Sequence, residues 1–579
     1  MRLLFVLTNA TTFTKINTNH LFDAFIFGFR LDFIVSTYVL TGIYLIYVLT
    51  KSRILATLLT TVFAFWASFI GLIDALYFKF LKERISYDFF SQLGPSNNIS
   101  LWTYIKDYWP MALVGVAITT IYIIWVRLNF KTKIKPNWLS LLIIIALALF
   151  IARGGFRLKP LRTADTGQYL TDDAHVVAFN TTLYIYETWT NPISTPVFVD
   201  ASNADLSETV FGQDSLIKPN FVIVILEGFG KEYTGLNRGM TNTYTPFLNS
   251  LISQSVCCHN AYANGLKSVD AVPAIFTGIP KLSTTAFIHS PHSTESRPSV
   301  FNLLEKIGYI SSFFHGANNQ TMGFQSYLKS NGLQAYYGIE EYPNAKSDFD
   351  GHWGIYDQPY LNYVKNKIST QTQPFLASVF TLSSHHPYAL PDHLKDSFKS
   401  GDIPIHHSIQ YSDYALQNFI TSCESEPWFE NTIFIITADH SAENLLHAYR
   451  TPSGKYEIPL LLYSPKLLPS EPIRKTVSHI DILPTILDIV NYPTPVVTLG
   501  SSIFTQNTNQ VVCHFDNNVY HITKNNWNYG VSSNNPVFLY NKKKDINCLN
   551  NTMSSNKEAT TELDRLLKQE VSKYFQLIK

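Results

Sequence analysis

Four polar residues of types that bind metals follow apolar runs of this chain. They are Glu227, His385, Asp439 and His440. In open α/β sheets, ligands bind at the carboxyl ends of the strands, so residues in such positions can meet at one edge. Carboxylates and a neutral imidazole together can hold a divalent cation. The pattern therefore predicts a divalent-metal site with oxygen and nitrogen ligands. The alternative is structural: Asp439 caps a helix and His440 packs beside it.

Ser268 is the candidate nucleophile. It follows a short loop that contains Asn264 and Gly265, and it stands where an apolar segment with helical character begins. A helix N-terminus favours an anionic substrate. A serine hydroxyl is a weak nucleophile until a neighbouring metal or base lowers its pKa. The alternative is that Ser268 only caps the helix. The other serines of the region lack this setting: Ser253, Ser283 and Ser293.

Alternating apolar segments would position these residues. The expected strands lie at 222–226, 311–315, 375–382, 432–437 and 458–463. The expected helices lie at 245–254, 300–307, 409–423 and 481–490. Strands that alternate with helices predict a mostly parallel sheet covered by helices on both faces. The tail differs, because short runs at 511–512, 519–522 and 537–540 predict a small antiparallel subdomain before a final helix at 561–577.

The first 153 residues have the character of a membrane module. Charged residues make up only 15% of the chain and aromatic residues 14%, whereas an ordinary soluble protein has about 25% charged residues. Uncharged runs of near-spanning length lie at 33–50, 54–73, 108–126 and 136–152. A short apolar run at 3–7 leaves the number of spans at four or five. The net charge of +1 gives no indication of nucleic-acid binding.

Charged residues between the apolar runs predict the orientation in the membrane. The links at 51–53 and 127–137 are basic and contain no acid, so they should face the cytoplasm. The last span then runs outward, and the domain after it lies outside the cytoplasm. We expect transmembrane helices in 1–153, a connector at the membrane surface in 154–215, and a catalytic domain in 216–579. The connector should contain a helix within 165–191 that carries Val176, Phe179, Leu183 and Tyr186 on one face. Arg30 and Asp32 stand just before the span that begins at residue 33; we expect a structural pair, and the alternatives are an interfacial anchor and contact with a lipid headgroup.

The order of six segments resembles the lipoteichoic acid synthase-like branch of the alkaline phosphatase/sulfatase superfamily. The segments are 221–229, 265–268, 381–387, 438–440, 456–460 and 478–485. In that branch, a membrane module of several spans carries an extracytoplasmic sulfatase-like domain. The resemblance covers the whole chain and is strongest from about residue 218 to 490. It therefore implies an N-terminal transmembrane helical bundle and a C-terminal α/β sulfatase-like domain.

The resemblance also implies roles for individual residues. Four residues match the metal ligands: Glu227, Ser268, Asp439 and His440. Ser268 also matches the nucleophile of the family. Three residues match substrate-binding positions: His385, which would contact the transferred phosphoryl group, and His315 and Trp353, which would line the pocket. Mn²⁺ is the expected metal, and Mg²⁺ or Zn²⁺ would suit similar ligands.

Two positions depart from the family pattern. The family nucleophile is usually threonine, and serine takes its place here. The residues after His315 are Asn318, Asn319 and Gln320 instead of the usual acidic or aromatic ones, which leaves the headgroup preference open. A sulfatase nucleophile would need a Cys/Ser-x-Pro-x-Arg setting. Residues 268–272 have neither the proline nor the arginine, so sulfate-ester hydrolysis is not favoured.

The function implied by the resemblance is transfer of a phospholipid headgroup at the bacterial cytoplasmic membrane. Glycerol phosphate would pass from a membrane phospholipid to a glycan or polymer of the envelope through a phosphoserine. The alternatives are a phosphoethanolamine transferase, a phosphodiesterase or other hydrolase that uses water as acceptor, and a non-catalytic sensor that kept the fold. The oligomeric state stays open, and the five cysteines allow at most two disulfides.

Overall fold

The N-terminal part is helical and strongly apolar. The computed structural model describes residues 1–13, 18–81, most of 83–90, parts of 109–124, 137–152 and 174–190, isolated positions between 163 and 199, and 206–578 with short gaps at 213–214, 238–243, 295–296, 400 and 507–509. Its N-terminal helices are α1 (Arg2–Thr8), α2 (Ala10–Phe13), α3 (Thr18–Thr50), α4 (Arg53–Leu81), α7 (Trp138–Ala152), α9 (Ala174–Ala178) and α10 (Thr181–Thr190). Among the described residues, α3 and α4 are long and apolar enough to cross a membrane.

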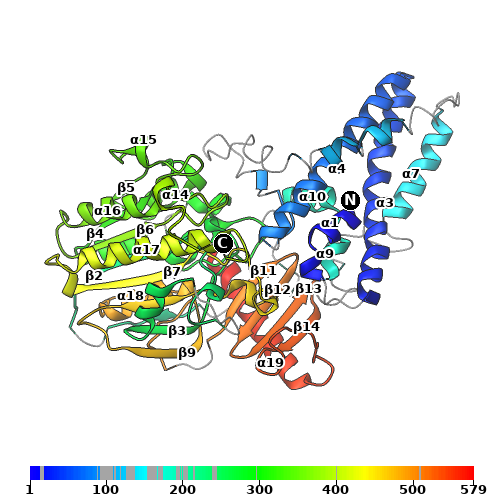
Figure 1. Ribbon diagram of the computed structural model, residues 1–579. Coiled ribbons are helices and arrows are strands. Elements are labelled where there is room, and N and C mark those ends of the chain that lie inside the picture. The colour runs from blue at the N-terminus through cyan, green and yellow to red at the C-terminus, as the bar shows by residue number, and fades with distance from the viewer. Residues whose placement is uncertain are drawn as a thin grey trace.

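The membrane helices differ in part from the predicted runs. Helix α3 begins at Thr18 and includes the Arg30 and Asp32 positions that we expected to precede it. The ion-pair partner of Asp32 is Arg2, at 2.8 Å, and Arg30 is exposed. Helix α7 lies beside α3 (Figure 1) and covers most of the predicted run at 136–152. The predicted run at 108–126 lies partly outside the described residues, and its described parts, 113–117 and 119–124, are helical.

The predicted connector helix within 165–191 is two helices in the described residues, α9 and α10. The chain leaves the helical conformation at Phe179 and Asn180, where the Phe179 carbonyl accepts a hydrogen bond from Arg2 and the Asn180 side-chain amide donates to Asp32. Val176, Phe179 and Leu183 are buried as predicted, but Tyr186 is 57% exposed. The single apolar face that we predicted is therefore wrong at its last position, because the two non-helical residues between α9 and α10 interrupt the helical periodicity.

The C-terminal part is built on an eight-stranded sheet with the order β5-β4-β6-β2-β7-β8-β3-β9. Its strands are β2 (Asn220–Leu226), β3 (Ser255–Tyr262), β4 (Ile310–His315), β5 (Ala335–Tyr337), β6 (Phe375–Phe380), β7 (Thr432–Ala438), β8 (Leu460–Tyr463) and β9 (Glu471–Ser478). Strands β5, β4, β6, β2 and β7 are parallel, and β8 is antiparallel to β7 and to β3. The predicted mostly parallel sheet is confirmed.

Helices pack around this sheet. They are α11 (Pro246–Ile252), α12 (Ser268–Thr277), α13 (Val300–Glu305), α14 (Phe324–Ser330), α15 (Ala345–Asp348), α16 (Asp357–Ile368), α17 (Ile405–Cys423) and α18 (Ile482–Ile489). Helices α16 and α17 pack together, and α12 packs with α13 and α18. Every side chain of β2 is buried. Burial of one large aliphatic side chain contributes about 1.5–3 kcal/mol, so this central strand is strongly fixed.

A second, antiparallel sheet follows and lies beside the large sheet, below the N-terminal helices in Figure 1. Its strands are β11 (Val512–Asp516), β12 (Val519–Lys524), β13 (Trp527–Ser532) and β14 (Asn535–Asn541), and α19 (Lys557–Ile578) packs on it. The predicted antiparallel subdomain is confirmed, although β13 was not expected. A short pair, β1 (Glu208–Thr209) with β10 (Val496–Val497), ties the connector to the domain. None of the five cysteines forms a disulfide.

Candidate active site

Glu227 lies at the end of the central strand, where three strand ends are bonded to one another. Its backbone N–H donates to Thr381 Oγ1 at 3.0 Å, after strand β6. The N–H of Asp439, after strand β7, donates to the Leu226 carbonyl at 3.2 Å. Gly228 then turns the chain with φ +65°, a conformation that favours glycine. These bonds bring the residues after β2, β6 and β7 to one edge of the sheet, as the sequence predicted.

Glu227, Asp439 and His440 form one buried cluster at this edge. Their ligand atoms lie within 4.8 Å of one another. His440 Nε2 is 3.2 Å from Asp439 Oδ2 and 3.7 Å from Glu227 Oε1. Burial, and next the charge of Asp439, hold the pKa of the Glu227 carboxyl well above its usual range. Two acids that are buried together without a cation disfavour each other's charged form.

The donor set of this cluster fits a divalent cation. Asp439 Oδ1 accepts hydrogen bonds from the N–H groups of Gly228 and His440, while Asp439 Oδ2 is buried and has no hydrogen-bond partner. The Nδ1 of His440 bonds to the Ser441 carbonyl at 3.0 Å, which requires Nδ1 to carry the proton. Its Nε2 therefore presents a lone pair to the cluster, the arrangement typical of metal-binding histidines.

Ser268 joins the cluster through its hydroxyl. It is the first residue of α12, and its Oγ donates to Glu227 Oε2 at 3.3 Å. Lys267 before it has an extended backbone, so the chain enters the helix at Ser268. The side chain of Asp270 occupies the space where a Cβ at position 265 would lie, at 2.1 Å, which explains Gly265 in the loop. The structure thus brings together the four residues that the sequence suggested as metal ligands.

His385 and Trp353 lie next to each other beside this edge. Their ring centres are 4.0 Å apart, and Trp353 Nε1 donates to the carbonyl of His386 at 2.7 Å. The Nδ1 of His385 bonds to the same carbonyl at 2.9 Å, which leaves Nε2 as its unprotonated nitrogen. Burial lowers the pKa of His385 to about 4, so its imidazole is neutral at physiological pH. Both residues are partly exposed, as pocket residues must be.

His315 has a different environment. It ends β4, two strands away from β2 in the sheet, and it is 1% exposed. Its ring lies against Phe380 and Phe324, with centroid distances of 5.1 and 5.4 Å. Neither ring nitrogen has a hydrogen-bond partner, and burial lowers the pKa to about 4. The structure does not place His315 in the metal cluster, and its role in substrate binding stays a prediction.

His479 is a site residue that sequence reasoning passed over. Its Nε2–H donates to the carbonyl of Ala438 at 2.8 Å, and its Nδ1 accepts the N–H of Asn264 at 3.4 Å. It therefore joins the strand that carries Asp439 to the loop that carries Ser268. Burial lowers its pKa to about 4, and this keeps the imidazole neutral and able to make both bonds. Its position within the segment 478–485 was the only signal in the sequence.

Asp357 is a second positioning residue that the sequence did not reveal. Its Oδ1 accepts the N–H groups of Leu382 and Ser383, at 2.8 and 3.0 Å. Its Oδ2 accepts the hydroxyl of Ser412 at 2.6 Å. Asp357 begins α16 directly after the segment that contains Trp353. It thus fixes the loop that carries His385 relative to Trp353.

Comparisons with known proteins agree with this architecture. Residues 219–492 match the Sulfatase family model. The chain is 24% identical over 274 residues to the lipoteichoic acid synthase-like YvgJ of Bacillus subtilis, covering 43% of this chain and 44% of the relative. It is 28% identical over 152 residues to phosphoglycerol transferase I of Escherichia fergusonii, covering 25% of this chain and 20% of the relative. The matched parts thus span less than half of these relatives.

A solved structure also matches the C-terminal part. It is a protein of the alkaline phosphatase superfamily from Vibrio parahaemolyticus, with a TM-score of 0.53 and 20% sequence identity. The match covers 64% of this chain and 93% of that chain. The α/β fold with a separate antiparallel sheet, predicted from the sequence, is therefore shared with a known structure.

Proposed function

We propose that the protein is a membrane phosphotransferase that depends on a divalent metal, and the match of residues 219–492 to the Sulfatase family model supports this proposal. It moves a phospholipid headgroup to a hydroxyl of an envelope glycan or polymer, and glycerol phosphate is our first choice for that headgroup. One observation carries the proposal: the Ser268 hydroxyl, at a helix N-terminus, is hydrogen-bonded to Glu227 within the cluster of Glu227, Asp439 and His440. The name of one curated relative, phosphoglycerol transferase I, supports phosphoglycerol as the group transferred.

Ser268 forms the covalent bond in the first step. Its oxygen attacks the phosphorus of the phospholipid, the bond between phosphorus and the diacylglycerol oxygen breaks, and the serine proton leaves as diacylglycerol takes one up. The product is a phosphodiester between Ser268 and glycerol. Glu227 accepts the hydroxyl hydrogen of Ser268 before attack. The N-terminus of α12 faces the phosphoryl group with its free N–H groups and its positive dipole end.

A divalent cation held by Glu227, Asp439, His440 and Ser268 would neutralise the phosphate charge and lower the pKa of the serine hydroxyl. Mn²⁺ is our first choice, with Mg²⁺ and Zn²⁺ as alternatives. The unpartnered Oδ2 of Asp439 and the lone pair of His440 Nε2 are where such a cation would bind.

His385 suits the second step. A hydroxyl of the acceptor attacks the phosphoserine, its proton must leave, and the Ser268 oxygen regains a proton as the phosphorus–serine bond breaks. The neutral imidazole of His385 has an unprotonated Nε2 because its Nδ1–H is bonded to the His386 carbonyl. We assign it the role of accepting the acceptor's proton. Trp353, 4.0 Å away, limits the positions that the ring can take.

The N-terminal helices explain the choice of a lipid donor. The aromatic ring of Phe80, in the last turn of α4, lies 5.6 Å from the ring of His386 beside His385. A donor phospholipid in the membrane crossed by α3 and α4 would thus have its headgroup close to the site. We place the catalytic domain outside the cytoplasm, at the bacterial cytoplasmic membrane, because the basic links at 51–53 and 127–137 should face inward.

The test is a turnover assay with purified protein in lipid vesicles. Phosphatidylglycerol, phosphatidylethanolamine and a mixture of both are incubated with the protein and Mn²⁺, and products are identified by mass spectrometry. The proposal predicts diacylglycerol and a glycerol phosphate adduct from phosphatidylglycerol. An ethanolamine phosphate adduct would show the other transferase. Release of free headgroup phosphate without an added acceptor would show a hydrolase, and no diacylglycerol from either lipid would refute the proposed function.

A further inference from the structure

The end of α4 contributes side chains to the loop that carries the nucleophile. Tyr77 and Phe80 lie three residues apart near the end of α4, and Glu83 comes shortly after the last residue of that helix, Leu81. Lys267 Nζ lies 5.8 Å from the centre of the Tyr77 ring and 3.5 Å from Glu83 Oε2. Phe80 contacts His386 on the opposite loop of the site. The same few residues of the N-terminal part thus contact both loops of the candidate active site.

Glu83 is buried and binds two lysines of the catalytic domain. Besides Lys267, its carboxylate pairs with Lys281. Lys281 Nζ also donates to the carbonyl of Phe515 at 3.2 Å, and its backbone N–H donates to the carbonyl of Asn264 at 3.3 Å. All three charged side chains are less than a tenth exposed. Glu83 therefore contacts Lys267 at one end of the nucleophile loop, 264–267. Through Lys281 it is also linked to Asn264 at the other end of that loop.

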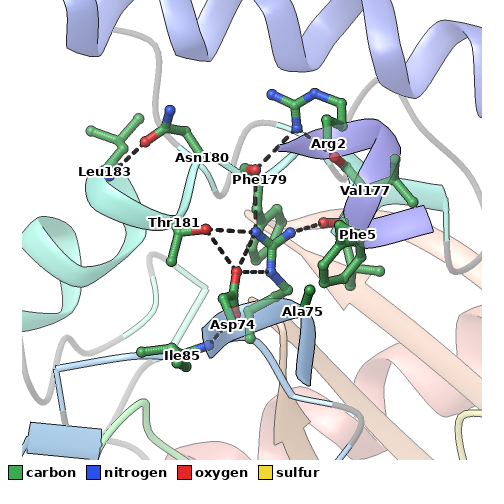
Figure 2. A network of polar contacts seen from close by, with 12 residues as sticks. Arg2, Phe5, Asp74, Ala75, Ile85, Val177, Phe179, Asn180, Thr181 and Leu183 are labelled. Carbon is green, nitrogen blue, oxygen red and sulfur yellow. Dashed lines mark hydrogen bonds and ion pairs between the residues drawn. The ribbon is translucent and has the colours of Figure 1, made fainter. Parts of the chain in front are cut away.

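A separate buried network fixes Glu83 itself. The neighbouring Arg84 bonds to Asp74 of α4 through its Nε at 2.7 Å and its Nη2 at 2.6 Å. Its Nη2 also donates to Thr181 Oγ1 at 3.1 Å, and Asp74 accepts the hydroxyl of Thr181 at 2.7 Å (Figure 2). The N–H of Ile85 donates to Asp74 Oδ1 at 2.8 Å. Glu83, the residue before Arg84, thus has little freedom to move away from Lys267 and Lys281.

We infer that Glu83 is a positioning residue for Ser268. It acts through Lys267, the residue directly before the nucleophile, and through Lys281. By holding these lysines it keeps the backbone of 264–267 in the conformation that directs the Ser268 hydroxyl to Glu227. The N-terminal helices therefore set the geometry of the nucleophile as well as bring the domain to the membrane. This inference extends the proposed function, and it rests on that function where the measurement is labelling of Ser268 by the phospholipid donor.

Two readouts test it on the full chain in lipid vesicles. In Glu83→Gln, hydrogen exchange of the backbone in 264–270 should be faster than in the wild type, because the loop loses a charged anchor. The rate of Ser268 labelling by saturating phosphatidylglycerol should fall by about 10–100-fold, since a displacement of about 1 Å can cost that much. The concentration of donor at half-maximal rate should change by less than about threefold, since Glu83 does not touch the substrate.

Two variants provide matched controls. Asp74→Asn loosens the network that holds Glu83 but leaves both Glu83–lysine ion pairs in place, so its folded fraction should label Ser268 faster than Glu83→Gln does, although more slowly than the wild type. In a Lys267→Met background, Glu83→Gln should have a smaller effect than in the wild type, because residues that act through one another are not additive. If Glu83→Gln lowers the rate of Ser268 labelling no more than Asp74→Asn does, the inference is overturned, since the effect would then belong to the interface as a whole.

The outcomes separate this inference from the proposed function. Equal exchange and equal labelling in the wild type and Glu83→Gln would refute the positioning role alone. Faster exchange in Glu83→Gln with no labelling of wild-type Ser268 would support the positioning role and refute the proposed function.

Discussion

Two buried polar clusters of this protein are built in opposite ways. At the junction of α4 with the catalytic domain, each acid has a basic partner: Asp74 pairs with Arg84, and Glu83 with Lys267 and Lys281. At the strand ends, Glu227 and Asp439 pair with no lysine or arginine among the described residues, and only His440 lies close. A buried acid without a cation is costly. The junction is complete as a structure, whereas under the proposed function a divalent cation would complete the strand-end cluster.

The largest expected effect concerns the nucleophile. Ser268→Ala should lower headgroup transfer by at least about 10³-fold, because removal of a covalent nucleophile leaves only binding and charge stabilisation. Ser268→Thr keeps the hydroxyl and should retain measurable transfer. Diacylglycerol release from phosphatidylglycerol vesicles measures both variants. Wild-type rates in Ser268→Ala would show that the hydroxyl takes no part in the reaction.

Equivalent substitutions in the two clusters should have opposite effects on stability. Asp74→Asn breaks a buried ion pair and should cost about 3–5 kcal/mol of unfolding free energy. Asp439→Asn in chelator-treated protein removes a charge that repels Glu227, and it should be neutral or slightly stabilising. Denaturant unfolding measures both. A similar loss in the two variants would remove the distinction between the clusters.

The amount of bound metal should also distinguish Asp439→Asn from Asp74→Asn. Asp439→Asn should reduce bound divalent metal to below about a tenth of the wild-type amount, since loss of one ligand weakens a four-ligand site strongly. Asp74→Asn should bind as much metal as the wild type. Elemental analysis after gel filtration provides the measurement, and wild-type metal content in Asp439→Asn would place the cation elsewhere.

The low pKa of His479 in the folded protein should make the unfolding free energy depend on pH, with an effect of moderate size. In the folded protein its pKa is about 4, whereas the ordinary value is 6.5. Between these values the unfolded chain binds the additional proton, so this contribution to stability falls as the pH decreases from 6.5 towards 4. His479→Phe leaves the Asn264 N–H without its partner and removes the imidazole bond to the Ala438 carbonyl, at a cost of about 2 kcal/mol at pH 7.5.

The cost of His479→Phe should therefore shrink on acidification, because only the wild type loses the histidine contribution. Unfolding curves of both proteins at pH 7.5 and 5 measure the difference. A cost that stays constant or grows at pH 5 would contradict the neutral, doubly bonded state of His479.

An exposed ion pair provides the smallest expected effect. Glu430 and Lys466 are paired on the surface, with side chains 63% and 60% exposed. Glu430→Gln should change the unfolding free energy by less than about 1 kcal/mol, because water already solvates both charges. It should leave metal content and headgroup transfer unchanged. A cost comparable to that of Asp74→Asn would mean that burial does not decide what these pairs contribute.

The residues of the strand-end cluster could be predicted because local patterns reveal them. Glu227 and Asp439 directly follow buried apolar strands, and parallel strands end at one edge. Strands β3 and β9 were missed because their sequences contain polar and charged residues, from Ser255 to Tyr262 and from Glu471 to Ser478. Pairing with neighbours in the sheet outweighs these weak local preferences.

The junction could not be predicted for a different reason. Glu83 and Lys267 are separated by 184 positions in the sequence, and Glu83, unlike Lys267 in the segment 265–268, lies in no recognisable motif. In the sequence, Glu83 is one of several mixed charges after an apolar run. Only the folded chain shows that its carboxylate is buried against two lysines. The role of His479 was hidden in the same way, because its two partners come from distant segments.

The most direct test of the account is the mass of the protein itself after reaction with its donor. Wild-type protein loaded with Mn²⁺ is mixed with phosphatidylglycerol vesicles without an acceptor, quenched in acid and analysed by intact-mass and peptide mass spectrometry. We predict an added mass of one glycerol phosphate less one water, located on Ser268 and absent from Ser268→Ala. Diacylglycerol release with an unmodified Ser268, or an adduct on another residue, would contradict the account.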